Sequence, residues 1–386
     1  MRILQLFADT ILEAEIGHAF ASLGHQVERF DVQGTSSVLD PHRFAVLLDG
    51  GKFDLVFTIN SQGFDAQGRM SALLEQTQLP TITWEIDHPY AMQLLGLRSR
   101  PSFASLYTFV WDEGYLADMH SLGWQRVFYL PLGIADELIQ PLPERPCPST
   151  FHHDFIFVGS SLRAFWHTFA TRLFPQSLVF PPELEALPTD ALRNHLVDTS
   201  IPFIEHLRTA LAPYAAAFNT PHERLLYELR AEIFASMNYR EWVIRQLPGL
   251  QVYGDVGWRD IAPGKYRGSV HYGPELFKLY GASRAVLNCT LVKNRFDANQ
   301  RIFDVFAAGS YPISDLRKNL ETCFPQQELA VYHHPRDLQS MLRELAPDTR
   351  MRDIQRGHAW VDRAHRLSSR LETMLGIVCG NEAQSD

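Results

Sequence analysis

The sequence predicts an α/β protein built from two doubly wound domains, and three observations lead to this prediction. Short apolar segments alternate with helical ones up to about residue 130, a proline-rich connector runs from Pro131 to Ser149, and the alternation then resumes. A chain of 386 residues is also too long for one ordinary core. Repeated βα units favour parallel sheets with helices on both faces. Two such domains are expected to enclose a cleft that can close over a substrate.

The first domain is predicted to span residues 1–140. Arg2–Phe7 is a short apolar strand, and the helix after it, Thr10–Leu23, has one apolar side and ends at Gly24. Ligands of such sheets bind beyond the carboxyl ends of the strands. Further strands are expected at Gln26–Phe30, Phe53–Ile59, Pro80–Trp84, Leu106–Val110 and Arg126–Leu130, and further helices at Gly68–Gln76 and Glu113–Ser121.

The second domain is predicted to span residues 150–350. It begins with a strand at Asp154–Val158, and a helical insert of about residues 163–247 follows. The clearest helix start in the insert has Thr220 as N-cap, Pro221 in the first turn and Glu223 closing a capping box. Later strands are expected at Gln251–Tyr253, Ala285–Asn288, Tyr311–Ser314 and Ala330–Tyr332, and a last helix at Met351–Ile377 within a terminal segment 351–378.

Composition and charge exclude several classes of protein. Apolar residues make up 46% of the chain and charged residues 20%, which is typical of a well-packed globular protein. The net charge of −9 argues against a nucleic-acid partner. No apolar run is long enough for a membrane span. The four scattered cysteines argue against a zinc site or a disulfide framework, and together with an early Asp9 they predict a cytoplasmic location.

The segment Asn294–Asp315 carries the clearest site signal. A helix is expected from about Ala298 to Ala308, with Arg301 and Asp304 three residues apart on one face and Gly309 at the end. An acid and a base aimed the same way beside a crevice suit the ribose and phosphates of a nucleotide. The alternative is an amphipathic helix with a glycine C-cap and a solvated ion pair.

A second signal is Gly159-Ser160, which follows a strand and lets backbone N–H groups approach a diphosphate. Neutralising a departing diphosphate without a metal requires cationic side chains. The candidates are Arg163, Lys293, Arg295 and Arg301, and the alternative for each is a surface charge. The chain has no P-loop motif and no dinucleotide fingerprint, which argues against a P-loop kinase and a classical dehydrogenase.

The third signal is Asp87-His88-Pro89, which follows the strand that ends at Trp84. His88 can take a proton near neutral pH while Asp87 orients it. The alternative is a loop aspartate that caps the next helix. Asn60 and Gln62 follow another strand and carry amide groups suited to sugar hydroxyls, or else they form a turn.

The order of motifs in the second half resembles GT-B glycosyltransferases. The residues concerned are Val252-Tyr-Gly254-Asp255, Tyr272-Gly273, Pro274–Tyr280, Ala285-Val-Leu-Asn288 and Arg301–Ile313. Within that family the chain is similar to the glycosyltransferases like the spore-maturation protein CgeB, also through Asn60–Asp65 and Glu85–Pro89.

The resemblance implies two Rossmann-like domains facing a cleft, with the donor on the second domain and the acceptor on the first. It also implies that the last helix crosses back to the first domain. Donor binding would fall to Gly159, Ser160, Arg163, Asn288, Arg301 and Asp304, acceptor binding to Asn60 and Gln62, and catalysis to Asp87 and His88. Many retaining relatives carry two glutamates eight positions apart, but here Phe296 and Asp304 occupy those positions.

The function expected from the sequence is transfer of a sugar from a nucleoside diphosphate sugar to a hydroxyl group of a glycan, a protein or a small molecule. No metal and no cofactor is expected to take part. Two alternatives stay open at this point. One is a nucleotide-sugar 2-epimerase on the same scaffold. The other is a two-lobed sugar-binding or assembly protein without catalysis, for which the Phe296 departure is the best support.

Overall fold

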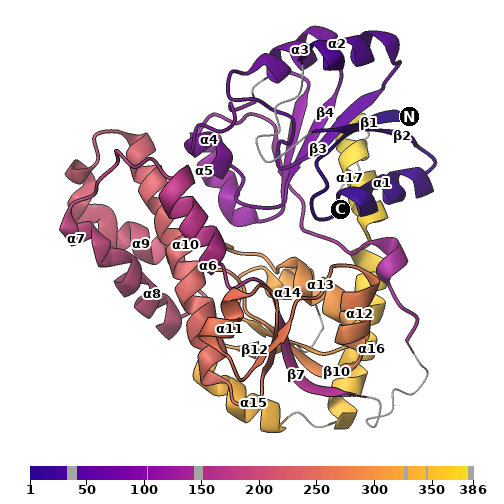
Figure 1. Cartoon of the computed structure of the whole chain (residues 1–386). Helices are drawn as coiled ribbons and strands as arrows, with labels where there is room; N and C mark the ends of the chain where they lie inside the picture. The colour runs from indigo at the N-terminus through magenta and orange to yellow at the C-terminus, as the bar shows by residue number, and fades with distance from the viewer. Residues whose placement is uncertain (33–40, 102, 143–150, 326–328, 345–346, 381–386) are drawn as a thin grey trace. The chain divides into compact units, whose positions relative to one another are not determined.

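The structure, a computed structural model, describes residues 1–32, 41–101, 103–142, 151–325, 329–344 and 347–380. It divides into two compact units (Figure 1). Unit 1 consists of Met1–Asp136 and His365–Asp386, and unit 2 consists of Glu137–Ala364. The end of the expected connector, residues 143–149, lies outside the described residues.

Unit 1 is built on a six-stranded sheet with the order β2-β1-β3-β4-β5-β6, and every pairing in it is parallel. The strands are β1 (Arg2–Phe7), β2 (Gln26–Asp31), β3 (Leu55–Ile59), β4 (Thr81–Glu85), β5 (Leu106–Val110) and β6 (Val127–Tyr129). The helices are α1 (Glu13–Ser22), α2 (Pro41–Gly50), α3 (Arg69–Thr77), α4 (Ala91–Leu94), α5 (Leu116–Ser121) and α17 (Leu367–Val378). Each strand predicted for this part of the chain is confirmed within two residues at either end.

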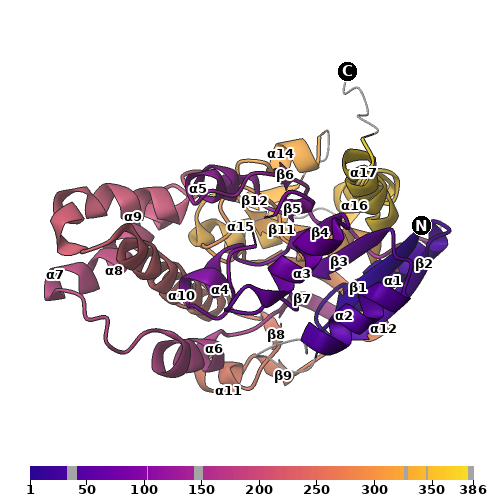
Figure 2. The ribbon, with the colours of Figure 1, turned by 90° about the horizontal axis from the view of Figure 1, so that it is seen from above.

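Helices cover both faces of this sheet (Figures 1 and 2). Side chains alternate along β1, so Leu4 and Leu6 pack in one apolar cluster with Phe44 of α2 and Leu74 of α3. On the other face α1 lies against α17, and Phe20 of α1 meets a phenylalanine of β3 edge to face. Burial on both faces explains why β3, with the sequence LVFTI, reads as a nearly continuous apolar run rather than an alternating one.

The expected last helix is instead two helices, α16 (Pro347–Ala364) and α17. The break has a backbone cause. Ile134 donates its N–H to the carbonyl of His365 at 2.8 Å and accepts from the N–H of Leu367 at 2.8 Å. Arg366 is therefore extended and pairs with Ile134 as a short bridge. Asp136 then caps α17 by accepting from the N–H of Ser368 at 3.1 Å.

Unit 2 is built on a second six-stranded parallel sheet with the order β12-β11-β10-β7-β8-β9. The strands are β7 (His153–Val158), β8 (Gln251–Tyr253), β9 (Tyr266–Gly268), β10 (Ser283–Asn288), β11 (Pro312–Asp315) and β12 (Ala330–Tyr332). Strand β9 was not expected from the sequence, because Tyr266–Gly268 has neither an apolar run nor an alternating pattern. The two parallel sheets confirm the predicted α/β class, whereas the cleft between the domains stays a prediction.

Helices fill the chain between β7 and β8. They are α6 (Arg163–Thr168), α7 (Pro182–Glu185), α8 (Leu187–Val197), α9 (Phe203–Leu211) and α10 (Pro221–Gln246), with one π-helical turn at Phe169–Leu173 and one 3₁₀ turn at Ala212–Ala217. Within unit 2, α8 and α9 pack against each other and against α10, to one side of the sheet (Figures 1 and 2).

Helix α10 starts where the capping pattern predicts. The Thr220 hydroxyl accepts from the N–H of Glu223 at 3.1 Å. The Glu223 carboxylate, however, reaches back one residue further than in a standard capping box and accepts from the N–H of Asn219 at 2.7 Å. The remaining helices of unit 2 are α11 (Gly257–Ile261), α12 (Pro274–Gly281), α13 (Gln300–Ala307), α14 (Leu320–Cys323), α15 (Leu338–Glu344) and α16.

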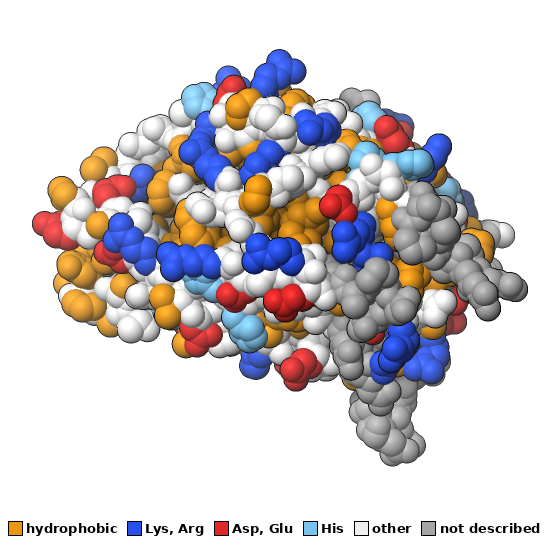
Figure 3. Space-filling view, turned by 90° about the horizontal axis from the view of Figure 1, so that it is seen from below, with side chains coloured by type: hydrophobic (Ala, Val, Ile, Leu, Met, Phe, Trp, Pro, Cys, Tyr) orange, Lys and Arg blue, Asp and Glu red, His pale blue; other side chains and the backbone are white. Residues whose placement is uncertain are grey.

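Charges of both signs share the surface. On the face drawn in Figure 3, basic and acidic side chains are interspersed with apolar ones. Among the helices that the structure describes, none combines the length and the apolar composition that a bilayer crossing requires.

Candidate functional site

The donor residues predicted from the sequence gather at the carboxyl edge of the unit 2 sheet. Strand β7 lies beside β10, and the chain continues from them to opposite sides of the sheet. Parallel sheets open a crevice where the strand order reverses in this way. Gly159 directly follows β7 and Asn288 ends β10. Two residues that are far apart in the sequence therefore meet at the place where this fold offers a binding site.

Arg301 of α13 joins them there. Its Nη1 donates to Oδ1 of Asn288 at 2.8 Å, and its guanidinium carbon lies 5.1 Å from the centre of the Phe157 ring. A Cβ atom on Gly159 would come within 2.9 Å of Nη2 of Arg301, so the glycine permits the close approach. The Nε atom of Arg301 is buried and has no hydrogen-bond partner among the described residues. Arg301 therefore keeps one buried N–H group, at Nε, available for a ligand.

A buried polar network fixes the orientation of Asn288. Its Nδ2 donates to the hydroxyls of Thr290 at 3.1 Å and Ser314 at 2.9 Å. The Thr290 hydroxyl donates in turn to Asp315 at 2.6 Å, and Arg317 holds that carboxylate at 2.6 Å. Because the amide nitrogen is engaged on this side, the amide oxygen faces Arg301. Through Asn288, the network therefore positions the guanidinium of Arg301.

The turn after β7 is already occupied by a carboxylate. Asp255, which follows β8, accepts from the Ser160 hydroxyl at 2.7 Å, the Ser161 N–H at 2.6 Å and the Ser161 hydroxyl at 2.6 Å. Burial raises the pKa of Asp255, but these hydrogen bonds outweigh it and lower the pKa overall, so the group stays ionised at neutral pH. The Ser160 side chain thus serves the shape of the turn.

Close backbone approach holds β7 and β8 together at this edge. Trp258 donates its indole N–H to the Gly159 carbonyl at 2.7 Å. Gly254 has φ +152°, and a Cβ atom there would lie 2.1 Å from the Gly159 carbonyl oxygen. Only glycine fits this position.

A second arginine, which is buried, lies behind the turn after β7. Arg240 of α10 is 4% exposed, and it donates to the Ser160 carbonyl at 2.8 Å and to the Cys289 carbonyl at 3.2 Å. It therefore ties the turn after β7 to the turn after β10. Burial, and next the charge of Arg301, lower the pKa of Arg240 to about 10, and it remains a cation at neutral pH.

Asp304 faces other partners than Arg301 does. It is buried, and its Oδ1 accepts from the Gln300 amide at 2.8 Å and from the Tyr272 hydroxyl at 3.2 Å. Helix α13 ends as predicted, with Gly309 at φ +75°. The solvated ion pair of the alternative interpretation is not the arrangement found, because Arg301 turns to Asn288 instead.

The neighbouring acid does not replace the glutamate that Phe296 displaces. Asp297 is fully buried, and it accepts from the Asn319 amide at 3.2 Å and from the Cys323 thiol at 3.8 Å. The Phe296 ring lies 4.1 Å from Nζ of Lys318. Asp297 therefore forms hydrogen bonds within unit 2. The chain still departs from the two-glutamate pattern at Phe296.

Two other predicted cations pair with acids of α10. Arg163 lies 2.8 Å from Glu241 and is part-exposed. The buried Arg295 lies 3.6 Å from the buried Glu232. The alternative of a solvated surface charge does not describe Arg295, since both members of its pair are covered. A donor role for Arg163 stays a prediction.

In unit 1 the residues predicted for the acceptor form a strained turn after β3. Asn60 and Ser61 have φ values of 50° and 52°, which is unusual for residues other than glycine. The Asn60 side chain accepts from the N–H groups of Ile86 at 2.8 Å and Asp87 at 3.2 Å. Gln62 accepts from Arg98 at 2.8 Å. Both amide oxygens therefore bind protein groups, and the turn alternative describes them well.

Glu85, the last residue of β4, is the acid that sequence reasoning missed. It is 3% exposed and accepts from the hydroxyls of Ser61 at 2.5 Å and Thr83 at 2.8 Å. Burial raises the pKa of Glu85 to about 7. A carboxyl group that titrates near neutral pH at a strand's carboxyl end marks a candidate functional position.

Asp87 and His88 follow Glu85 at the same edge. Asp87 is exposed, and its carbonyl accepts from the indole N–H of Trp111 at 3.2 Å. The His88 ring is half-buried between two tyrosines, 4.6 Å from the centre of Tyr90 and 5.0 Å from that of Tyr115. Asp87 does not cap the next helix, because α4 begins after Tyr90. The pair stays a catalytic candidate.

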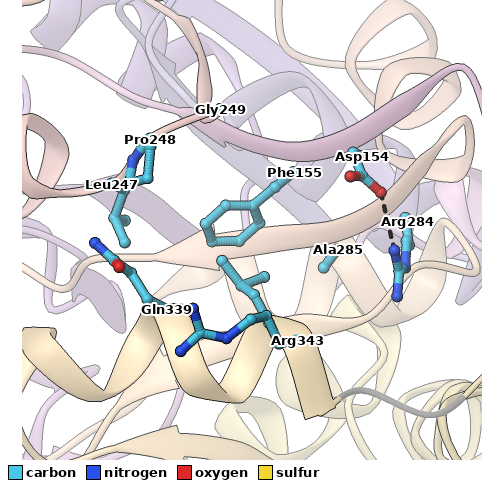
Figure 4. Close-up of a pocket in the computed structure, with 10 residues that line it drawn as sticks. Asp154, Phe155, Leu247, Pro248, Gly249, Arg284, Ala285, Gln339 and Arg343 are labelled. Carbon is cyan, nitrogen blue, oxygen red and sulfur yellow. Dashed lines mark hydrogen bonds and ion pairs between the residues drawn. The ribbon is translucent and has the colours of Figure 1, made fainter.

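A cavity of about 400 Å³ lies elsewhere in unit 2. Figure 4 shows that it is lined by Phe155, Ala285, Leu247 and Arg343, with an ion pair between Asp154 and Arg284 at its side. Its strand residues, which include Phe155 and Ala285, lie toward the amino ends of β7 and β10, on the opposite edge of the sheet from Gly159 and Asn288. None of the predicted site residues lines this cavity, and we assign it no role in the chemistry.

Within the described part of the chain, no cluster of three or more histidine, cysteine, aspartate or glutamate side chains has a metal-binding arrangement. The residues missed in the crevice are Arg240 and Asp255. Asp255 had a local signal, since an acid after a glycine at a strand end often holds a neighbouring turn. Arg240 had none, because it reaches the crevice from the middle of a long helix.

Comparison with known proteins adds a partial family match and a fold. Residues 232–376 match the family model described as glycosyl transferase-like. A sequence search of curated proteins gives no match. Among solved structures, sucrose-phosphate synthase from Thermosynechococcus elongatus superposes with a TM-score of 0.55 at 9% identity, covering 100% of both chains.

Two further structures give the same result. Alr3699/HepE from Anabaena, in complex with UDP-glucose, has a TM-score of 0.53 at 11% identity, covering 98% of this chain and 100% of its own. A glycosyltransferase from Rickettsia africae ESF-5 has a TM-score of 0.53 at 11% identity, covering 100% of this chain and 99% of its own. At such identities the likeness establishes the fold, which is the two-sheet GT-B arrangement.

Proposed function

We infer that this chain is a glycosyltransferase of the GT-B type, because a glycosyl transferase-like stretch and the GT-B fold occur together in it. We propose that it transfers a sugar from a nucleoside diphosphate sugar to a hydroxyl group of an acceptor. The observation that carries the proposal is Arg301, held by Asn288 and stacked on Phe157 where the strand order of the sheet reverses.

The role proposed for Arg301 is to bind the donor diphosphate. Transfer of the sugar leaves negative charge on the departing diphosphate, and a preorganised guanidinium stabilises that charge in the transition state. Gly159 has no side chain, and this lets Nη2 of Arg301 lie close to the turn after β7. Arg240 adds a second positive charge at the turn after β7, which supports the proposal that the leaving group is neutralised without a metal.

Asp304 is proposed to bind a ribose hydroxyl. Its carboxylate can exchange the Gln300 and Tyr272 contacts for a ligand hydroxyl without a change in charge. The acceptor hydroxyl is proposed to meet Asp87 and His88 in unit 1. His88 is proposed to accept the proton of that hydroxyl, and the two tyrosine rings fix the plane of its imidazole.

The finer parts of the proposal rest on the sequence. They are the likeness to CgeB-like glycosyltransferases, independence of metal ions, a cytoplasmic location, and a glycan, protein or small-molecule acceptor. We expect activity to persist in EDTA. Because the Anabaena neighbour holds UDP-glucose, UDP sugars come first in the donor panel.

Arg301→Ala tests the donor site. Thermal unfolding of the full chain is followed with UDP, other nucleoside diphosphates and their sugars, in EDTA and then with magnesium. A ligand at a hundredfold excess over its Kd stabilises the folded state by about 2.7 kcal/mol. We expect this stabilisation with one nucleotide family for the wild type, and its loss in Arg301→Ala with the unliganded midpoint little changed.

Arg230→Ala is the matched control. Arg230 of α10 is also part-buried. Its guanidinium lies over the rings of Phe174 and Phe180, away from the crevice. Unchanged donor affinity in Arg301→Ala, or equal loss in both variants, contradicts the placement of the donor. Product analysis then separates the alternatives. Sugar on an acceptor means transfer, an altered sugar on the nucleotide means epimerisation, and binding without turnover means a non-catalytic protein.

A further inference from the structure

Two strand ends of unit 1 are joined by side chains rather than by the sheet alone. The turn after β3 contains Asn60 and Ser61, and the segment after β4 leads to Asp87 and His88. The Asn60 oxygen accepts from the N–H groups of Ile86 and Asp87 and so connects the two. The geometry of the proposed reacting pair therefore depends on how the Asn60 turn is held.

The turn is held against its own conformational preference. Two consecutive residues other than glycine lie in the left-handed region, at φ 50° and 52°. Each such residue is unfavourable and persists only where its surroundings determine the conformation. Strain of this kind concentrates at functional sites, which gives a reason to ask what holds it.

Glu85 forms the central contacts that hold the Asn60–Gln62 turn. Its carboxyl group accepts from the Ser61 hydroxyl at 2.5 Å. Thr83 completes a triangle, because its hydroxyl donates to Glu85 at 2.8 Å and accepts from the Ser61 N–H at 3.0 Å. Arg98 donates to the Asn60 carbonyl and to Gln62 from the other side.

The protonation state of Glu85 depends in part on two charged groups near it. Arg98 is the cation that faces it, and Asp87 is the acid. Arg98 is itself buried, and the charge of Glu85 opposes the lowering of its pKa by burial. Arg98 and Glu85 are thus the buried base and the buried acid beside the strained turn.

We propose that Glu85 is a positioning residue, whose buried carboxyl group locks the Asn60–Gln62 turn and through Asn60 sets the place of Asp87 and His88. This inference rests on the proposed transferase function for its consequence, since the group positioned is the proposed acceptor-side machinery. Its structural content can be tested without any substrate.

The experiment compares Glu85→Ala and Glu85→Gln in the full chain, with Glu75→Gln as control. Glutamine keeps an oxygen for Ser61 and Thr83, whereas alanine removes it. Glu75 is exposed on α3 and away from the turn. Amide hydrogen exchange is measured for peptides that cover residues 58–64 and 84–90, and steady-state kinetics are measured with donor and acceptor.

We expect exchange at Ser61, Ile86 and Asp87 to accelerate by roughly tenfold in Glu85→Ala, the effect of weakening about one hydrogen bond. Glu85→Gln should restore most of this protection. Acceptor kcat/KM should fall in Glu85→Ala while donor Kd stays unchanged, and Glu85→Gln should restore most of the acceptor kcat/KM.

Unchanged exchange at these amides in Glu85→Ala overturns the proposal, and so does a loss of donor affinity equal to the loss in acceptor kcat/KM. If Glu85→Ala fails to fold, Ser61→Ala removes the same hydrogen bond with a smaller change. If the wild type shows no transfer, the proposed function fails, while the exchange data still decide whether Glu85 holds the turn.

Discussion

Replacing Glu85 by glutamine should change how stability depends on pH. Burial raises the pKa of this carboxyl group from 4.5 to about 7, against the opposing effects of the Ser61 and Thr83 hydroxyls and Arg98. Between these two values the folded chain keeps a proton that the unfolded chain has lost. The stability that protonated Glu85 contributes is therefore fully present below pH 4.5 and is lost as the pH rises through 7.

The pKa difference of 2.5, taken as 7 minus 4.5, sets the magnitude. At 1.36 kcal/mol per pKa unit it corresponds to about 3 kcal/mol. Glutamine resembles the protonated acid and does not titrate. Glu85→Gln should therefore have nearly wild-type stability near pH 4.5, and at pH 8 it should be more stable than the wild type by up to about 3 kcal/mol.

Urea unfolding of both proteins at matched pH values from 4.5 to 8 measures this difference, because other titrating groups cancel in the comparison. Tryptophan fluorescence is a suitable probe, since Trp84 is buried in β4 itself. A difference that stays constant over this range would refute the reasoning, because Glu85 would then titrate alike in the folded and unfolded chains. A difference of opposite sign would mean that Arg98 requires the negative charge.

Two further substitutions test the crevice and the long helix. Gly254→Ala should abolish donor binding and lower the unfolding midpoint, because its Cβ would lie 2.1 Å from the Gly159 carbonyl oxygen. The control is Gly264→Ala, since Gly264 has open space around it. Thr220→Ala removes the N-cap of α10 and should cost about 1 kcal/mol in urea unfolding, with donor affinity retained. Wild-type donor binding in Gly254→Ala would refute the first prediction, and unchanged stability in Thr220→Ala the second.

Much of the fold was predictable from local patterns. Strands such as Leu106–Val110 and Ala330–Tyr332 were predicted to the residue, because turn residues bound short apolar runs there. Helix breaks caused by distant backbone were not predictable. The interruption at Arg366 arises from pairing with Ile134, more than two hundred residues earlier, and nothing in the local sequence carries that information.

The candidate site divides in the same way. Gly159, Asn288 and Arg301 were predicted separately, and the order of parallel strands brings them together. Glu85 stood in a quoted motif, but its role depends on a neighbouring turn adopting two left-handed residues, which no propensity indicates. Arg240 could not be found, since its partners are backbone carbonyls of two other segments.

The glycosyl transferase-like stretch, residues 232–376, does not coincide with a folding unit. It starts inside α10 and omits β7, which lies between β10 and β8 in the sheet. Without β7 the sheet would separate into β12-β11-β10 and β8-β9, each with an unpaired inner edge. The stretch would also lose Phe157 and Gly159, against which Arg301 packs. The match covers Asn288 and Arg301, while the crevice that orients them needs the strand that precedes the helices.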